Sequence, residues 1–166
     1  MKSQLRVLGL LTAAVVLAGG TAFAEAKIGF VNVSQVFDSY EKTKQFDADL
    51  QKESEAKRAQ RDTLVSAVKK LRDEVEVMAP EAREEKQKQM DQKVQELQAF
   101  DRDARLTLRK KRDDMIRDIL KEIDTVIQAY GKEKGYDYIY NDRVLVFKKD
   151  QSDLSQEIIA RLNAKK

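Results

Sequence analysis

Histidine and cysteine are both absent from this chain, and their absence removes several classes of chemistry. Without histidine there is no Ser–His–Asp triad, and without cysteine there is neither a thiol nucleophile nor a disulfide framework. Most zinc sites are excluded as well. The segment GKEKG at 131–135 has neither the P-loop nor the dinucleotide-binding spacing. We therefore expect no enzyme, no cofactor and no metal site.

Proline, glycine and aromatic residues are also scarce. The 166 residues include one proline and six glycines, and only 7% are aromatic, whereas 37% are charged. Such a chain is too poor in turn residues for a loop-rich enzyme or an all-β sandwich. An abundance of Ala, Gln, Glu, Lys, Arg and Leu is instead typical of long helices and coiled coils, and the length fits one domain.

The one long apolar run lies at the N-terminus and has the pattern of a secretory signal. Lys2 and Arg6 precede the run VLGLLTAAVVLAGG, and an A-x-A pattern follows at Ala22–Ala24. A single membrane anchor is the alternative, but a span needs about 20 apolar residues and this run is shorter. We expect cleavage after Ala24 and export from the cytoplasm.

A single proline, Pro80, separates two long stretches with helical character. The first runs over 34–79, with Ser34 as N-cap, and the second over about 81–130. Proline is tolerated only in the first turn of a helix, so it ends one helix and begins the next. Gly131 and Gly135 mark the far end. The sequence predicts an antiparallel hairpin with arms about 70 Å long.

Apolar residues recur every three or four positions in both stretches and define a seam. They are Leu64, Val68, Leu71, Val75 and Met78 in the first stretch, and Met90, Val94, Leu97, Phe100, Ala104 and Leu108 in the second. Helices that turn at Pro80 should pair residues whose numbers add to about 160, a constant sum that a straight hairpin requires. The pairs that fit are Leu71 with Met90, Leu64 with Leu97, Ala56 with Ala104, Phe46 with Met115 and Phe37 with Ile123.

The middle of the predicted hairpin offers few large apolar side chains. Residues 51–63 contribute only Ala56 and Ala59, which would face Phe100 and Ala104. Burying a methyl group stabilises far less than burying a leucine, at about 25 cal/mol per Å² of apolar surface. This region is either a weak point that bends or merely an inefficient coiled coil.

Three β-prone segments and a short helix lie at the two ends of the mature chain. We expect strands at 27–33, 136–142 and 143–149. Asn141 and Asp142 would form the tight turn of a hairpin between the last two strands. Ser152 would cap a final helix that carries Leu154, Ile158 and Leu162 on one face.

This predicted body is too small to be stable alone. About forty residues make a weak core, and apolar strands leave open edges, so we expect an obligate oligomer. The residues assigned to the contact between subunits are Ile28, Phe30, Val31, Tyr138, Val144 and Val146. The expected organisation is a signal peptide at 1–24, a β-body formed by 25–42 and 115–166, and a helical arm at 43–114. The fold class is thus mainly α with a small β-body.

Two surface features are candidates for binding another molecule. One is the arginine strip, formed by Arg102, Arg105, Arg109 and Arg112, which are spaced 3-4-3 and share a helix face. The strip is either a solvated flank of the coiled coil or a positive surface for acidic unfolded chains or lipid headgroups. The other feature is the pair Val77 and Met78, which would offer apolar contact at the tip of the hairpin.

Both ends of the mature chain resemble the Skp/OmpH family of periplasmic chaperones. The opening AKIGFVNVSQVFDSY and the closing KGYDYIYNDRVLVFKKDQSDLSQEIIARLN are similar to family segments, with a charged helical hairpin between them. The resemblance implies a periplasmic homotrimer in which strands of three subunits build the body and three hairpins enclose a client. It also implies ATP-independent binding of unfolded outer-membrane proteins, and a lipopolysaccharide or anionic-lipid site that matches the arginine strip only loosely.

Three functions are compatible with these features to different degrees. A holdase binds exposed chains through many weak contacts, since a tight site would trap its client. A structural coiled-coil spacer of the cell envelope is the alternative, and it would need a lipid or wall anchor. Nucleic-acid binding is disfavoured, because removal of the signal leaves 30 basic against 29 acidic residues. The sequence therefore favours the holdase.

Overall fold

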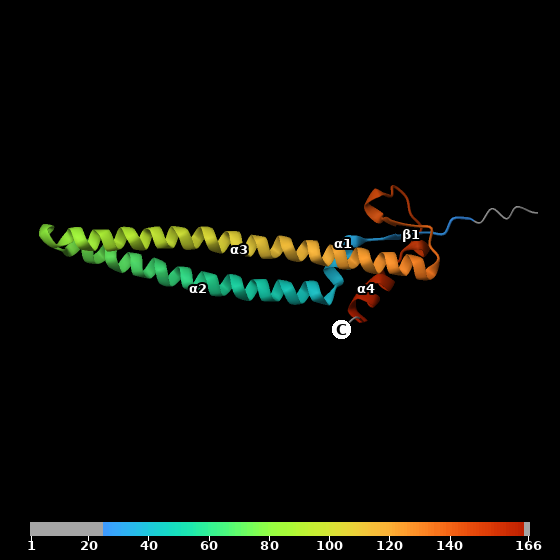
Figure 1. The fold of residues 1–166 in the computed structure, drawn as a ribbon, viewed down its shortest axis with the longest axis horizontal. Helices are drawn as coiled ribbons and strands as arrows, with labels where there is room; N and C mark the ends of the chain where they lie inside the picture. Colours follow the sequence, from blue (N-terminus) through green and yellow to red (C-terminus); the bar gives the residue numbers. More distant parts are fainter. Residues whose placement is uncertain (1–24, 165–166) are drawn as a thin grey trace, which may run out of the picture.

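Two long antiparallel helices project from a small body at one end of the molecule (Figure 1). The computed structural model describes residues 25–164, so the expected signal peptide at 1–24 lies outside the described residues. In chain order the elements are β1 (Ile28–Val31), α1 (Val33–Ser39), α2 (Glu41–Val77), α3 (Pro80–Lys134), β2 (Tyr138–Asn141), the 3-10 turns η1 (Asp142–Val144) and η2 (Asp150–Ser152), and α4 (Ser155–Ala164). The predicted fold class is confirmed.

The tip of the hairpin forms where the proline predicts it. α2 ends at Val77, Met78 is its C-cap, and Pro80 is the first residue of α3. The fixed φ of proline suits this position, where no intrahelical N–H is needed. Arg83 closes the turn, because its Nε donates to the carbonyl oxygen of Met78 at 2.7 Å.

The far end of α3 lies beyond its predicted limit. The helix continues through Gly131 to Lys134, and Gly135 caps it in the left-handed region with a φ of 66°. Glycine adopts this conformation without the steric cost that a Cβ would bring. Of the two predicted end signals, Gly135 ends the helix, whereas Gly131 is buried within it.

The first predicted helix is interrupted near its start, which corrects the sequence prediction. α1 ends at Ser39, and Tyr40 adopts an extended conformation with ψ of 124° before α2 begins. Asn32, rather than Ser34, is the N-cap of α1, because its side chain accepts from the backbone N–H of Gln35 at 2.8 Å. Neither glycine nor proline lies near the interruption, so no local signal marks it.

Asn163 of α4 stabilises this interruption from a distant part of the sequence. Its Oδ1 accepts from the backbone N–H of Glu41 at 2.9 Å, and its Nδ2 donates to the carbonyl oxygen of Ser39 at 3.3 Å. Backbone groups freed at a helix break need such partners when water is partly excluded. Tyr40 also contributes, since its hydroxyl donates to Glu122 of α3 at 3.0 Å.

The predicted seam residues of the arms, 64–78 in α2 and 90–108 in α3, are half-buried, as expected. Ion pairs bridge the arms, and their residue numbers add to 160 for Lys86 with Glu74, 162 for Arg61 with Asp101, and 164 for Lys111 with Glu53. The contact of the Lys57 ammonium group with the Phe100 ring gives 157. The cross-arm contacts thus scatter around the predicted sum of about 160, within about one helical turn that long side chains can span.

The sheet has two parallel strands, which corrects the predicted β-hairpin. β1 pairs with β2 in a register that places Ile28 opposite Tyr138 and Val31 opposite Asn141. Parallel strands need a long crossover, and the whole helical arm provides it, since β1 precedes the arm and β2 follows it. Residues 143–149 form no strand, because the chain leaves β2 through η1.

A bend at Asn141 explains why a third strand does not pair with β2. Residues beyond the loop contact the other strand, since the N–H of Leu154 donates to the carbonyl oxygen of Phe30 in β1 at 2.9 Å. The side chain of Asn141 accepts from the N–H of Arg143 at 3.2 Å and bends the chain into η1. The segment 145–149 is left as an irregular loop.

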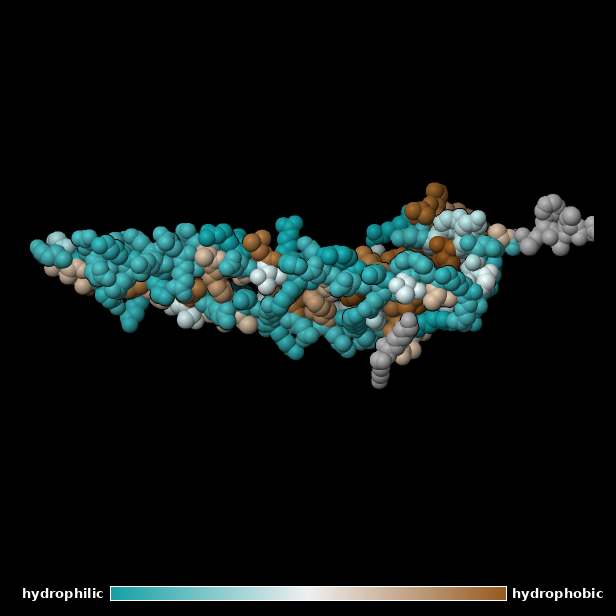
Figure 2. All heavy atoms as spheres, in the orientation of Figure 1, coloured by the Kyte–Doolittle hydropathy of each residue, from teal (hydrophilic) through white to brown (hydrophobic). Residues whose placement is uncertain are grey.

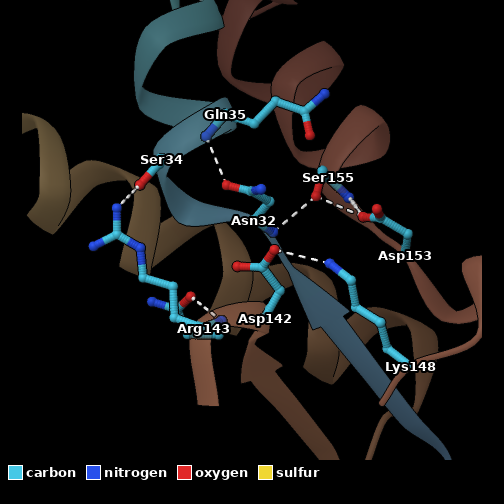
Figure 3. Close-up of polar contacts among 9 residues, drawn as sticks. Asn32, Ser34, Gln35, Asp142, Arg143, Lys148, Asp153 and Ser155 are labelled. Carbon is cyan, nitrogen blue, oxygen red and sulfur yellow. Dashed lines mark hydrogen bonds and ion pairs between the residues drawn. The ribbon is translucent and has the colours of Figure 1, made fainter. Parts of the chain in front are cut away.

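α4 begins three residues after the predicted cap, Ser152, which belongs to η2 instead. The carboxylate of Asp153 accepts from the N–H and the hydroxyl of Ser155, at 2.9 and 2.5 Å. The Ser155 hydroxyl in turn accepts from the N–H of Asn32 at 2.8 Å, so α4 and α1 are joined where each begins (Figure 3). Leu154, Ile158 and Leu162 are all buried, as predicted.

The core of the molecule lies in the body. Its buried apolar residues are Phe30, Val31, Val36, Tyr40, Met115, Ile119, Ile123, Val126, Tyr130, Leu154, Ile158 and Leu162. No residue between Thr43 and Met115 is buried, so the arms are held by half-buried contacts and ion pairs alone. None of the helices in residues 25–164 combines the length and the apolar character needed to cross a membrane.

Candidate binding surfaces

The tip carries one well-exposed apolar side chain. Val77 is 85% exposed, whereas Met78 beside it is half-buried. Arg83 holds this turn through the two carbonyl oxygens of Met78 and Glu76, at 2.7 and 3.5 Å. Of the two predicted tip residues, Val77 is therefore the one free to contact another molecule.

All four residues of the arginine strip are exposed on α3. Arg105 donates through Nε to the carbonyl oxygen of Asp101 at 3.0 Å, a bond within the helix. Arg109 lies 3.9 Å from Asp113, which is a long ion pair between exposed groups. An ion pair between exposed groups is weak, so Asp113 does not hold Arg109 firmly. The positive charge of the strip therefore remains available to a partner.

Two adjoining hollows between α2 and α3 form a groove that includes part of the strip, and we call it the basic groove. The two hollows share Ser54 and Leu108. The basic residues of the groove are Lys57, Arg58, Arg61, Arg105, Arg109 and Arg112, and its acids are Asp47, Asp101 and Asp113. Apolar atoms come from Leu50, Phe100, Leu108 and Ile116. The groove is thus positive at its sides and apolar between them.

Sequence reasoning missed half of these basic residues. Lys57, Arg58 and Arg61 belong to the segment KRAQR of α2 and face the strip across the groove. Arg102, which the strip includes, lines neither hollow. The predicted pairing of the arms contained the signal needed to find the α2 residues, because it places 58 close to 102.

The predicted alanine seam is wrong for α2. Ala56 and Ala59 are both exposed, while Lys57 is half-buried and its Nζ lies 5.5 Å from the ring centroid of Phe100. Next along the helix, Arg61 pairs with Asp101 at 3.0 Å. Long basic side chains cover the seam here, because their aliphatic stems pack while their charged ends reach a partner or water.

Acidic residues line a different part of the hairpin. A hollow near the body is lined by Asp49, Glu53, Asp114 and Asp118, with Lys42 and Lys111 as its bases. Hydrogen bonds from Lys110 and Arg117 lower the pKa of Asp114. Lys111 pairs with Glu53 at 2.5 Å, so cations compensate much of the acidic charge around this hollow.

The residues assigned to subunit contact divide into two groups. Ile28, Tyr138, Val144 and Val146 are exposed, at 49%, 55%, 69% and 106%. Phe30 and Val31 are instead buried within the chain itself, at 2% and 1%. Two further aromatic residues that were not predicted are also exposed: Tyr140 is 40% exposed and Phe147 is 81% exposed. Figure 2 shows hydrophobic atoms gathered on the body, where the loop after β2 protrudes.

Polar contacts hold this protruding loop against the body (Figure 3). Lys148 donates to the carboxylate of Asp142 at 2.8 Å, and its Nζ lies 4.5 Å from the ring centroid of Phe30. Arg143 donates to the hydroxyl of Ser34 in α1. The loop is thus fixed at both ends, with Val146 and Phe147 directed to solvent between them. No group of acidic residues in 25–164 is arranged to hold a metal ion.

Comparison with known proteins identifies the fold and the family. A sequence profile of the OmpH-like outer membrane proteins matches residues 27–162. This chain belongs to the OmpH-like family. It is 25% identical over 158 residues to the Skp-like protein of Pseudomonas aeruginosa, covering 93% of this chain and 94% of that protein. A crystal structure of an OmpH-like protein from Caulobacter crescentus CB15 has the same fold, with a TM-score of 0.72. The two sequences are 15% identical, and the match covers 86% of this chain and 87% of the Caulobacter chain.

The match to the OmpH-like outer membrane proteins thus confirms the predicted family. For this OmpH-like chain, the structure gathers Arg105, Arg109 and Arg112 into one groove with residues of α2. Val77 lies far from that groove, at the tip of the arm (Figure 1). The assignment of these residues to client binding stays a prediction, as does the division of the chain into body and arm.

Proposed function

We propose that this OmpH-like chain is an ATP-independent periplasmic holdase that binds unfolded outer-membrane proteins and prevents their aggregation. The observation that carries the proposal is the arm. It is a long hairpin with no buried residue between Thr43 and Met115, and it combines charged rims with half-buried apolar atoms. Such a surface offers many weak contacts to an exposed chain and no tight pocket in which a client would be trapped.

The exposed apolar surface of the body supports assembly into a trimer as part of the same proposal. Val144, Val146 and Phe147 protrude from a small body, together with Ile28 and Tyr138 at the open end of the sheet. Large exposed apolar side chains that gather on a small body support an interaction site there. Three bodies joined through it would place three arms around a common space for a client.

An aggregation assay tests the proposed function. Urea-unfolded outer-membrane protein is diluted into buffer with and without the mature chain, and light scattering is followed over time. We expect near-stoichiometric protein to suppress scattering, equally with and without ATP. Unchanged scattering at a several-fold excess of the chain would refute the holdase proposal, and suppression that needs ATP would refute its ATP independence.

A further inference from the structure

The basic groove differs from a solvated helix flank because its charge comes from both helices. Six basic residues face three acids across it. Two of the acids already have partners, since Asp101 pairs with Arg61 at 3.0 Å and Asp113 lies 3.9 Å from Arg109. Among the described residues, Arg58, Arg105 and Arg112 have no carboxylate within ion-pair distance, so three guanidinium groups remain for a ligand.

The dimensions of the groove suit a short extended peptide. On α2 its lining runs from Asp47 to Arg61, which is about 21 Å at 1.5 Å per residue. An extended chain advances about 3.3 Å per residue, so the groove accommodates about six residues. Leu50, Phe100, Leu108 and Ile116 provide apolar contact along this length.

We propose that the basic groove binds extended client segments in which acidic side chains lie next to apolar ones. Guanidinium groups bind carboxylates through paired, charge-assisted hydrogen bonds, while the apolar atoms between the helices contact the neighbouring side chains. The hollow lined by Asp49, Glu53, Asp114 and Asp118 offers no such set of unpaired cations, because its Lys111 pairs with Glu53 and its Lys42 pairs with Glu122. The basic groove therefore selects segments in which acidic and apolar side chains are neighbours. This inference rests on the proposed holdase function, since it names the client segment that the arm prefers.

The test uses two double variants of the full mature chain with the same change in charge. R58E/R105E places one reversal on each helix inside the groove. R72E/K121E places one reversal on each helix outside the groove and outside the arginine strip, because Arg72 and Lys121 are exposed and line neither hollow. All four basic residues are exposed, so both variants should keep the melting temperature and oligomeric mass of the wild type.

Fluorescence anisotropy measures binding of an eight-residue peptide that contains Glu, Leu and Phe, and of a second peptide with Lys in place of Glu. We expect the wild type to bind the acidic peptide more tightly than the basic one. The Kd for the acidic peptide should rise at least about fivefold in R58E/R105E and less than about twofold in R72E/K121E. The difference between the two variants in the Kd for the acidic peptide should shrink as the salt concentration is raised.

Equal weakening in both variants would show a diffuse field rather than a groove and would overturn the inference. Unchanged binding in R58E/R105E would overturn it as well. Loss of phosphatidylglycerol vesicle binding in R58E/R105E, with peptide binding intact, would assign the groove to anionic lipid instead. The aggregation assay separates the two proposals. If the wild type suppresses aggregation but does not bind the acidic peptide selectively, only the groove inference is refuted. If the wild type binds the acidic peptide selectively but does not suppress aggregation, the groove inference stands and the holdase proposal is refuted.

Discussion

Phe30 and Val146 are both apolar residues of the body, yet they lie in opposite environments. Phe30 is 2% exposed, and the ammonium group of Lys148 lies over its ring at 4.5 Å. Val146 is 106% exposed at the outermost part of the loop. The first residue therefore supports the fold of a single chain, whereas the second is available for contact between chains.

Substitution of Phe30 by Asp should destabilise the body itself. A buried carboxylate without a partner is costly, and we expect a loss of at least about 3 kcal/mol in the free energy of unfolding. Phe30→Leu, which keeps the site apolar, should cost about 1–2 kcal/mol. Urea unfolding followed by circular dichroism measures both changes. Wild-type stability for Phe30→Asp would mean that the residue is not part of the core.

Glu133 gives the body a dependence on acid pH. The guanidinium group of Arg161 donates to both of its carboxylate oxygens, at 2.6 and 2.8 Å, which lowers the pKa of Glu133 to about 2. A depressed folded-state pKa stabilises the fold above the unfolded value of about 4.5, and this contribution disappears as pH falls through about 2. The pair is partly exposed, so the effect is modest.

We expect Glu133→Gln to lower the melting temperature relative to the wild type at pH 7. The gap between the two proteins should narrow steadily between about pH 4.5 and pH 2, because the wild type loses the ion pair there. Melting curves at intervals of half a pH unit measure this change. A gap that stays constant to pH 2 would show that the ion pair does not control this part of the acid response.

At the scale of the helices, the arm and the body differ in how firmly α3 is held. Near the body, Ile119 and Ile123 are each 1% exposed and belong to the core. In the middle of the arm, the seam depends on Lys57 over Phe100 and on the pair of Arg61 with Asp101. Contacts of this kind replace buried apolar area with exposed polar interactions, which lowers the free energy needed to open the helices locally.

Hydrogen exchange should report this difference directly. Backbone amides at 53–61 and 100–108 should exchange at least about tenfold faster than those at 119–126. Lys57→Leu should slow exchange in the middle of the arm, because a leucine there can pack on Phe100. Ala56→Leu, one residue away and exposed, is the matched control and should have little effect. Uniform protection along both arms, or an equal response to both variants, would contradict the assignment of Lys57 to the seam.

At the scale of the whole molecule, the chain has a small core at one end and a long arm without buried residues at the other. Small domains bury too little apolar surface to be robust alone, and oligomerisation is a common remedy. The exposed loop with Val144, Val146 and Phe147 provides the apolar surface for it. The predicted trimer is therefore expected to form through the body and to leave the arms free.

Val146→Asp should dissociate the predicted trimer, because it would place an unpaired charge in the contact between subunits. Val77→Asp is the matched control, since Val77 is 85% exposed at the tip and far from the body. Native mass spectrometry and light scattering should give a trimer for the wild type and for Val77→Asp, and smaller species for Val146→Asp. A folded wild-type monomer at micromolar concentration would contradict trimer formation.

Local physics allowed the sequence alone to determine the helical hairpin. The apolar spacing of three and four residues at 64–78 and 90–108 fixes which faces of the arms meet there, and Pro80 fixes where the chain turns. Gly135 ends α3 because its left-handed conformation excludes most other residues. The buried face of α4, with Ile158 and Leu162, follows from the same periodicity, and Leu154 just before the helix continues it.

Tertiary structure decided the features that depend on partners distant in the sequence. α2 is separated from α1 because Asn163 binds the backbone groups freed on both sides of Tyr40. β2 pairs in parallel with β1, and not with the segment after it, because Asn141 bends the chain away from β2. The basic groove could not be found from one helix face, since half of its basic residues come from the helix opposite and only the packing of the two arms brings them together.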